Sequence, residues 1–296
     1  MDPEHALLNV SLLVGAEIDF IVGLLTDLFI VVVNVIDWKK AGTLTTADHV
    51  IISMTISKMF LQCIIQLNIF WGSPCVTYYL VSGFLINVGY DSAIYSFIWF
   101  CTLLSVVHYL KISNLHSIFL LNLRIIISKR ILHIIAAIVF VSVGLSSVGN
   151  GIHYKSYSQN STRFFSYIDT QLDRTRVALL MLFNMAPLVI CFLASALLIF
   201  SLCFHVNQMK GNKNLTSSLV VYYRTMKCTG ISAINCAMYV CINFFIQSYY
   251  CFFGVIIPSF TLSSLLTFHS IYMIFATAKL KKWLSKILHH LQNQEA

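Results

Sequence analysis

Long stretches without a charged residue alternate along this chain with short polar and basic segments. A helix of about 20 residues crosses the hydrocarbon layer of a bilayer, because each residue advances a helix by about 1.5 Å. The apolar stretches reach that length, and the last, Cys228–Ala278, is long enough for two helices and a tight loop. The pattern predicts seven spanning helices, at residues 12–36, 49–70, 81–109, 131–148, 177–205, 228–248 and 253–278.

The expected fold is an all-α membrane protein, a seven-transmembrane-helix bundle that forms a single domain over residues 1–296. The composition agrees, since 58% of the residues are hydrophobic and only 10% are charged, against about 25% charged in globular proteins. The first four residues are acidic overall, where a cleavable signal peptide would begin with basic residues. We therefore expect the first spanning helix to act as the targeting signal.

Basic residues predict the orientation of the bundle. Most of the 19 Lys and Arg residues fall in alternate loops on one side and in the tail, and the positive-inside rule places that side in the cytoplasm. We expect a multi-pass plasma membrane protein with its N-terminus outside and its C-terminus cytoplasmic. The tail 279–296 alternates Leu and Ile with Lys and predicts a short amphipathic helix on the inner leaflet.

Three sequons for N-glycosylation occur, and the orientation decides among them. Asn160 lies in the middle of the long outer loop and is the expected site. Asn9 is too close to the membrane, and Asn214 lies on the cytoplasmic side.

Two opposite charges interrupt the first two spans. Asp27 is nine residues from Ile36, and Lys58 is nine residues from His49, so both lie roughly 14 Å from the cytoplasmic boundary. Because an unpaired charge in lipid is costly, we interpret them as an intramembrane ion pair. The alternative is that each bonds separately to polar neighbours or to water.

Asp91 interrupts the third span about 15 Å below its outer end, next to Tyr90 and one turn from Tyr95. Two interpretations remain open. The carboxylate could be the counter-charge for a cationic ligand, with cation–π support from the aromatic rings. It could equally be a structural hydrogen-bond partner of a neighbouring helix.

Short motifs occur in the same order as in one known family. They are Phe29–Trp38, Ser57-Lys58, Trp99, Leu110-Lys111-Ile112, Asn114, Phe119-Leu120, Leu123-Arg124, Pro187, Leu197-Leu198-Ile199, Ser201-Leu202, His205, Met209, Lys227, Tyr239, His269-Ser270 and Lys279-Leu280-Lys281. The ordered set, on a seven-helix frame, resembles the bitter taste receptor family (type 2 taste receptors) over nearly the whole chain.

The resemblance implies a G-protein-coupled receptor that binds small bitter compounds from outside and activates a gustducin/Gi-type heterotrimeric G protein. Tyr239 matches a position of the family that senses ligand at the pocket floor, and Tyr239, Asn243 and Ile246 share one helical face. For these residues a core stripe is the alternative. The expected ligand-binding residues are Tyr90, Asp91, Ile94, Tyr95, Tyr239, Asn243 and Ile246.

Coupling to the G protein is expected at the inner ends of the third, fifth and sixth helices. The residues we assign to it are His108, Lys111, Arg124, His205 and Lys227. Binding of anionic membrane lipids is the alternative role of these cations.

This chain departs from the family pattern at several positions. Asp27 and Lys58 replace the usual Asn and Arg, Tyr90 replaces a frequent pocket Trp, and Val107-His108 replaces Phe-Tyr. The ligand repertoire and basal activity of relatives are therefore not transferable.

Rival functions have less support. A retinal protein would need a lysine within the last span, which has none. An ion or solute transporter could use Asp27, Lys58 and Asp91, but internal repeats are missing. The histidines lack metal-ligand spacing, so we expect no metal, cofactor or enzymatic activity, and topology explains the basic residues without nucleic acid. A vomeronasal type 1-like chemoreceptor is the alternative among receptors.

Overall fold

The computed structural model describes residues 3–71, 80–112, 118–159, 167–209, 216–248 and 256–295, which are almost entirely helical. Seven of the described helices are long and apolar enough to cross a membrane. In chain order the helices are α1 (Pro3–Ala41), α2 (Thr46–Trp71), α3 (Leu80–Ile112), α4 (Ile118–Gln159), α5 (Tyr167–Met209), α6 (Thr216–Ser248), α8 (Ile256–Ala276) and α9 (Ala278–Glu295). This is a multi-pass membrane protein, a bundle of seven spanning helices.

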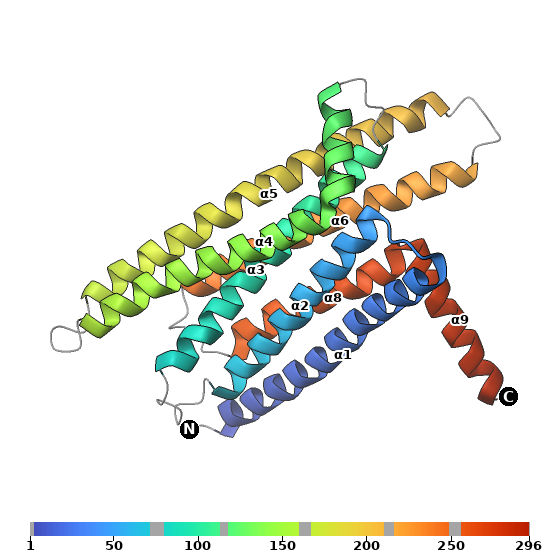
Figure 1. Ribbon diagram of the computed structural model, residues 1–296. Coiled ribbons are helices and arrows are strands. Elements are labelled where there is room, and N and C mark those ends of the chain that lie inside the picture. The colour runs from blue at the N-terminus through green and yellow to red at the C-terminus, as the bar shows by residue number, and fades with distance from the viewer. Residues whose placement is uncertain are drawn as a thin grey trace.

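The spanning helices lie alongside one another in alternating directions (Figure 1). The start of α1 lies at one end of the bundle, and α9 leaves from the other at an angle to it (Figure 1). We call these the Pro3 end and the α9 end. Because seven helices cross the bundle, the two termini lie at opposite ends.

Helix α3 lies at the centre of the bundle and packs against α2, α4, α5 and α6. Of the residues in its most apolar segment, 78% are buried, against 17% of those in the corresponding segment of α4. Large apolar side chains are exposed on the outer helices, including Phe140 at 81% and Phe200 at 74%. In a bilayer such side chains face lipid tails, which are as apolar as leucine. Polar side chains can therefore gather only inside the bundle.

Capping interactions define where α1 ends and α2 begins. Gly42 follows α1 with φ +71°, and its N–H donates to the Trp38 carbonyl at 2.8 Å, which is the left-handed helix end that glycine allows. At the start of α2 the Asp48 N–H donates to Thr45 Oγ1 at 3.2 Å, and the Thr45 N–H donates to Asp48 Oδ2 at 3.3 Å. This reciprocal cap fixes the beginning of α2.

Several helices extend beyond the predicted spans. Helix α4 begins at Ile118 rather than near Ile131 and bends at Arg130, where φ is −116° and ψ is 21°. Helix α5 begins at Tyr167 rather than near Val177. The predicted spans end where charges begin, whereas Arg, Lys and Gln continue a helix into water at little cost.

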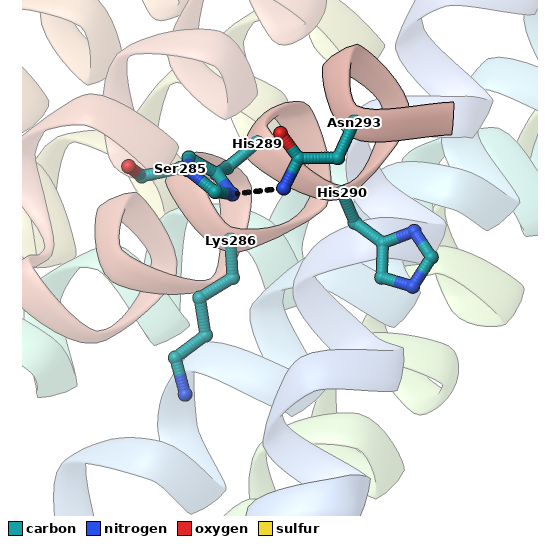
Figure 2. Close-up of a pocket in the computed structure, with 5 residues that line it drawn as sticks. All are labelled: Ser285, Lys286, His289, His290 and Asn293. Atoms are coloured by element: carbon teal, nitrogen blue, oxygen red, sulfur yellow. Dashed lines mark hydrogen bonds between the residues drawn. The ribbon is translucent and has the colours of Figure 1, made fainter. Parts of the chain in front are cut away.

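Helix α9 is attached to the end of α1 by polar contacts. Trp283 Nε1 donates to Asp37 Oδ1 at 3.2 Å. Lys279 Nζ donates to Asn34 Oδ1 at 2.8 Å and lies 3.2 Å from Asp37 Oδ2. The adjoining polar face of α9 begins at Lys286, whose Nζ lies 5.6 Å from the centroid of the Trp283 ring. This face borders an open hollow lined by Ser285, Lys286, His289, His290 and Asn293 (Figure 2). One helix supplies all five residues, so the hollow is a feature of that surface and not an enclosed site.

Candidate functional site

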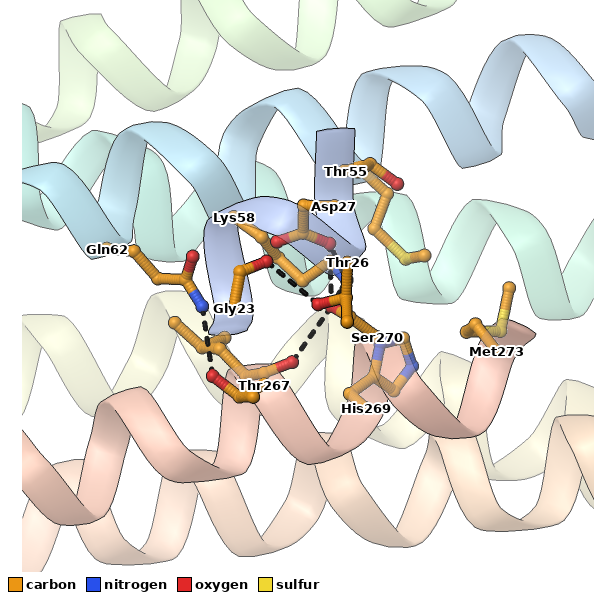
Figure 3. A network of polar contacts seen from close by, with 12 residues as sticks. Gly23, Thr26, Asp27, Thr55, Lys58, Gln62, Thr267, His269, Ser270 and Met273 are labelled. Carbon is orange, nitrogen blue, oxygen red and sulfur yellow. Dashed lines mark hydrogen bonds and ion pairs between the residues drawn. The ribbon is translucent and has the colours of Figure 1, made fainter. Parts of the chain in front are cut away.

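An ion pair lies at the middle of the bundle, between α1 and α2. Lys58 Nζ is 2.9 Å from Asp27 Oδ1, and both side chains are completely buried. Ser270 of α8 completes the group, because its hydroxyl donates to Asp27 Oδ1 at 2.6 Å and also contacts Lys58 Nζ (Figure 3). The structure thus brings together the two charges that the sequence places at equal depth.

Polar contacts continue around this ion pair. Gln62 Nε2 donates to Thr267 Oγ1 at 3.3 Å (Figure 3), and His269 Nε2 lies 3.2 Å from the Ser232 hydroxyl of α6. These contacts join α2 to α8 and α8 to α6 inside the membrane. A buried polar group is stable there only when its hydrogen bonds are made within the protein.

Asp91 lies between α3 and α4. Asn150 Nδ2 donates to Asp91 Oδ2 at 2.8 Å, and Ser146 of the same helix donates to the Val88 carbonyl at 2.6 Å. The carboxylate is 2% exposed. One of its oxygen atoms is therefore bonded to a neighbouring helix, as the structural interpretation of Asp91 requires.

Tyr90 connects α3 to α6. Its hydroxyl donates to Asn243 Oδ1 at 3.1 Å. One turn below Asn243 lies Tyr239, which is completely buried and packs edge-on against Phe97 with ring centroids 5.6 Å apart. Phe97 in turn packs edge-on against His269 at 6.0 Å. A continuous set of contacts thus leads from the predicted ligand-binding face to His269, which precedes Ser270 of the buried ion-pair group.

The other predicted ligand-binding residues differ in surroundings. Ile94 is buried in the main hydrophobic core, as expected of a core stripe. Tyr95 is buried and packs edge-on against Phe183 of α5 at 6.3 Å. The side chain of Ile246 and the sequon residue Asn160 lie outside the part of the chain that the structure describes. Within the described part of the set, Tyr90 contacts Asn243, whereas Asp91 and Tyr95 contact α4 and α5.

The predicted coupling residues lie at the α9 end. His108 Nδ1 is 3.3 Å from the Thr229 hydroxyl of α6. Lys111 is exposed at the end of α3, and Arg124 and Lys227 are exposed within the first halves of α4 and α6. The side chain of His205 is not among those described. Residues from three helices therefore present positive charge at this end.

Sequence reasoning did not identify Ser270, Asn150 or Asn243 as the partners of Lys58, Asp91 and Tyr90. The motif His269-Ser270 was a signal for the first of these, and the position of Asn243 on the Tyr239 face was a signal for the third. No local pattern marks Asn150, because spacing along one helix does not reveal which helix faces it.

Comparison with known proteins shows which family this chain is similar to. The family model described as Taste receptor protein (TAS2R) matches residues 5–292. Taste receptor type 2 member 9 of Macaca mulatta is 31% identical over 195 residues, which cover 64% of this chain and 62% of that relative. Taste receptor type 2 member 13 of Homo sapiens is 30% identical over 207 residues, which cover 66% of each chain.

These matches span slightly less than two thirds of the length of each relative. The family model extends over nearly the whole of the chain, including all seven spanning helices and most of α9. The chain therefore belongs to the taste receptor (TAS2R) family.

Proposed function

We propose that this protein is a G-protein-coupled receptor that detects small bitter compounds at the Pro3 end and activates a gustducin/Gi-type G protein at the α9 end. One observation carries the proposal. Helices α3 and α6 are bridged at two levels, by Tyr90–Asn243 at 3.1 Å toward the Pro3 end and by His108–Thr229 at 3.3 Å nearer the α9 end. A ligand that alters the first bridge can change the position of the second, because both belong to the same two helices.

The orientation of the receptor follows from its charges. The loops and tail at the α9 end hold most of the Lys and Arg residues, so this end is cytoplasmic and the Pro3 end is extracellular. The predicted ligand-binding residues on α3 and α6 lie toward the Pro3 end, and the predicted coupling residues lie toward the α9 end.

The ligand-binding site consists of Tyr90, Asp91, Ile94, Tyr95, Tyr239, Asn243 and Ile246. Its polar groups are a tyrosine hydroxyl, a carboxylate and an amide within apolar surroundings, which is the usual composition of a small-molecule site. Asn150 holds the Asp91 carboxylate in a fixed place through its 2.8 Å hydrogen bond. A cationic ligand would gain most from that carboxylate, and a ligand that hydrogen-bonds Tyr90 or Asn243 replaces the bridge between α3 and α6.

Activation requires a ligand that binds the active arrangement of helices more tightly than the inactive one. The change in α3 and α6 reaches His108, Lys111 and Lys227 at the α9 end, and Arg124 of α4 and His205 of α5 complete the basic surface. Such a surface is complementary to an acidic partner, and this is where we place the G protein.

Calcium flux in cells that carry a gustducin-like chimeric G protein tests this function. A panel of neutral and cationic bitter compounds should give a response that cells without the receptor lack. Lys227→Gln should weaken the response at equal surface expression, whereas Lys286→Gln, which removes the same charge from the polar face of α9 (Figure 2), should not. A response that does not require the G protein would contradict the proposal.

A further inference from the structure

A cleft opens between α2, α3 and α4 at the α9 end. Its volume is about 380 Å³, and we call it the α2–α3–α4 cleft. The floor is apolar and includes Val107, Leu110 and Ile127, which are buried members of the main core. The rim is polar and carries the hydroxyls of Thr46 and Ser128 together with Lys111 and Arg124. An apolar floor under two cations and two hydroxyls is a site for an amphiphilic anion.

The cleft and the surface toward α6 lie on different sides of α3. Val107, Leu110 and Lys111 have the i, i+3, i+4 spacing of one helical face, and all three line the cleft. His108 adjoins Lys111 at i, i+3, but its ring turns toward α6, where Nδ1 lies 3.3 Å from the Thr229 hydroxyl. Lys111 and Arg124 can therefore bind a ligand in the cleft while α6 is contacted by a different partner.

The positive charge of the cleft is not neutralised by nearby acids. Lys111 and Arg124 are the only charged residues in its lining, and no ion pair joins either of them to a carboxylate in the described part of the chain. The neighbouring Asp48 accepts a hydrogen bond from the Thr45 hydroxyl at 2.8 Å. Its other oxygen lies 3.6 Å from Lys279 of α9, which Asp48 shares with Asp37, so Asp48 contacts Thr45 and Lys279 rather than the cations of the cleft.

The depth of the cleft identifies the source of the anion. The spanning segment of α2 begins at Thr46 and that of α3 ends at Lys111. Both residues line the cleft, so it lies at the level of the lipid headgroups. On α4, Leu121 lies one turn before Arg124, is 45% exposed and offers apolar surface to an acyl chain. The two cations would each attract an anionic headgroup of the cytoplasmic leaflet.

We propose that the α2–α3–α4 cleft binds one anionic phospholipid of the inner leaflet, with its phosphate between Lys111 and Arg124 and its glycerol–acyl junction over Val107, Leu110 and Ile127. The inference rests on the cytoplasmic orientation of the α9 end in the proposed function. It gives Lys111 and Arg124 a role that does not depend on agonist or on the G protein.

Native mass spectrometry of the full-length receptor, released from nanodiscs of phosphatidylcholine with a minor fraction of phosphatidylserine or phosphatidylinositol bisphosphate, tests this site. The wild type should retain one anionic lipid in preference to phosphatidylcholine. Lys111→Gln with Arg124→Gln should reduce that preference roughly tenfold or more, as two lost cations near the membrane surface imply. Lys281→Gln with Lys282→Gln removes the same charge from exposed positions of α9 and should leave the preference unchanged.

Two further variants separate the site from general charge and from misfolding. Ala47→Leu narrows the cleft without changing any charge and should also abolish the preference. Lys111→Arg with Arg124→Lys keeps both cations and should retain the preference. Equal retention in the wild type and the Lys111→Gln/Arg124→Gln variant would overturn the proposal, as would equal loss in the α9 control.

The test also distinguishes other ligands. Soluble glycerophosphate should not displace the lipid, because it lacks acyl chains, and full displacement would indicate a simple phosphate site instead. If the neutralised variant keeps its lipid but loses G-protein activation, the cleft belongs to the coupling surface and the proposal is wrong. The lipid readout needs no agonist, so a failure of the bitter-receptor function would not be mistaken for a failure here.

Discussion

Lys58 Nζ lies 2.9 Å from Asp27 Oδ1 in the middle of the bundle, and neither side chain is exposed. The Ser270 hydroxyl donates to the same carboxylate oxygen at 2.6 Å, so three helices meet at one buried charged group. An ion pair in such a place costs much to desolvate, and its main effect is to penalise any arrangement that separates the partners. The contact therefore specifies how α1, α2 and α8 pack.

Removal of one partner of this ion pair should be far worse than removal of both. Asp27→Asn or Lys58→Met should lower stability by about 3–5 kcal/mol, because each leaves a buried charge without its counter-charge. Asp27→Leu with Lys58→Met should recover most of that loss, since the Ser270 hydroxyl keeps its 3.0 Å bond to the Leu266 carbonyl.

Thermal unfolding of the purified receptor, followed by fluorescence-detected size exclusion, measures these differences. Lys227→Met is the matched control, because Lys227 is exposed, and it should change the melting temperature little. A double variant no more stable than the worse single variant would contradict the pairing as the source of stability.

Asp91→Asn tests the role of charge in the ligand-binding site. The amide oxygen can still accept the bond that Asn150 Nδ2 donates at 2.8 Å, so the variant removes charge and keeps the link to α4. Half-maximal concentrations should rise about tenfold or more for cationic agonists, since one charge interaction near a protein surface can supply several kcal/mol at most, and neutral agonists should be unaffected. Equal losses for both classes would assign Asp91 a purely structural role.

How far the sequence predicts this structure is clear from the buried ion pair. Counting residues from Ile36 and His49 gives the depth of Asp27 and Lys58, and a cost argument then pairs them. The same count cannot supply Ser270, because depth along a helix does not show which face of α8 turns inward. The sequence does not predict the partner of Asp91 for the same reason. Asn150 lies 59 residues away, in a segment that carries no motif.

Helix ends show a second limit. Hydropathy marks where the hydrocarbon layer ends, whereas α1 stops at Ala41 because Gly42 adopts φ +71°. Before its bend at Arg130, helix α4 extends back through Lys129 and Arg124 to Ile118, because basic residues are good helix formers in water. Hydropathy therefore predicts the seven spanning helices. It does not predict how far each helix extends beyond the hydrocarbon layer, because that depends on backbone conformation.

We expect the hydrogen bond between Tyr90 and Asn243 to stabilise the inactive state of the receptor. Tyr90→Phe removes the donor, and a bond of this kind contributes about 0.5–1.5 kcal/mol, so basal signalling should rise about two- to tenfold if the bond is specific to the resting state. Asn243→Ala should act similarly, and the double variant should add little. Additive effects in this double-mutant cycle, measured by basal reporter activity at matched surface expression, would show that the two residues act separately.

Glycosylation provides a test of orientation. With the Pro3 end outside, Asn160 faces the lumen during synthesis and Asn214 does not. A shift on glycosidase treatment should therefore disappear in Asn160→Gln and persist in Asn214→Gln. The reverse pattern would mean that the bundle is inverted in the membrane.

Agonist-stimulated nucleotide exchange is the most direct test of a receptor that joins an outer ligand site to an inner coupling surface. The purified receptor in nanodiscs would be mixed with a purified gustducin/Gi-type heterotrimer and a bitter agonist chosen from the calcium screen. We predict that agonist accelerates exchange on the heterotrimer and that Lys227→Gln abolishes most of the acceleration at unchanged stability. Exchange that stays at its basal rate with every agonist that the receptor binds would contradict the account.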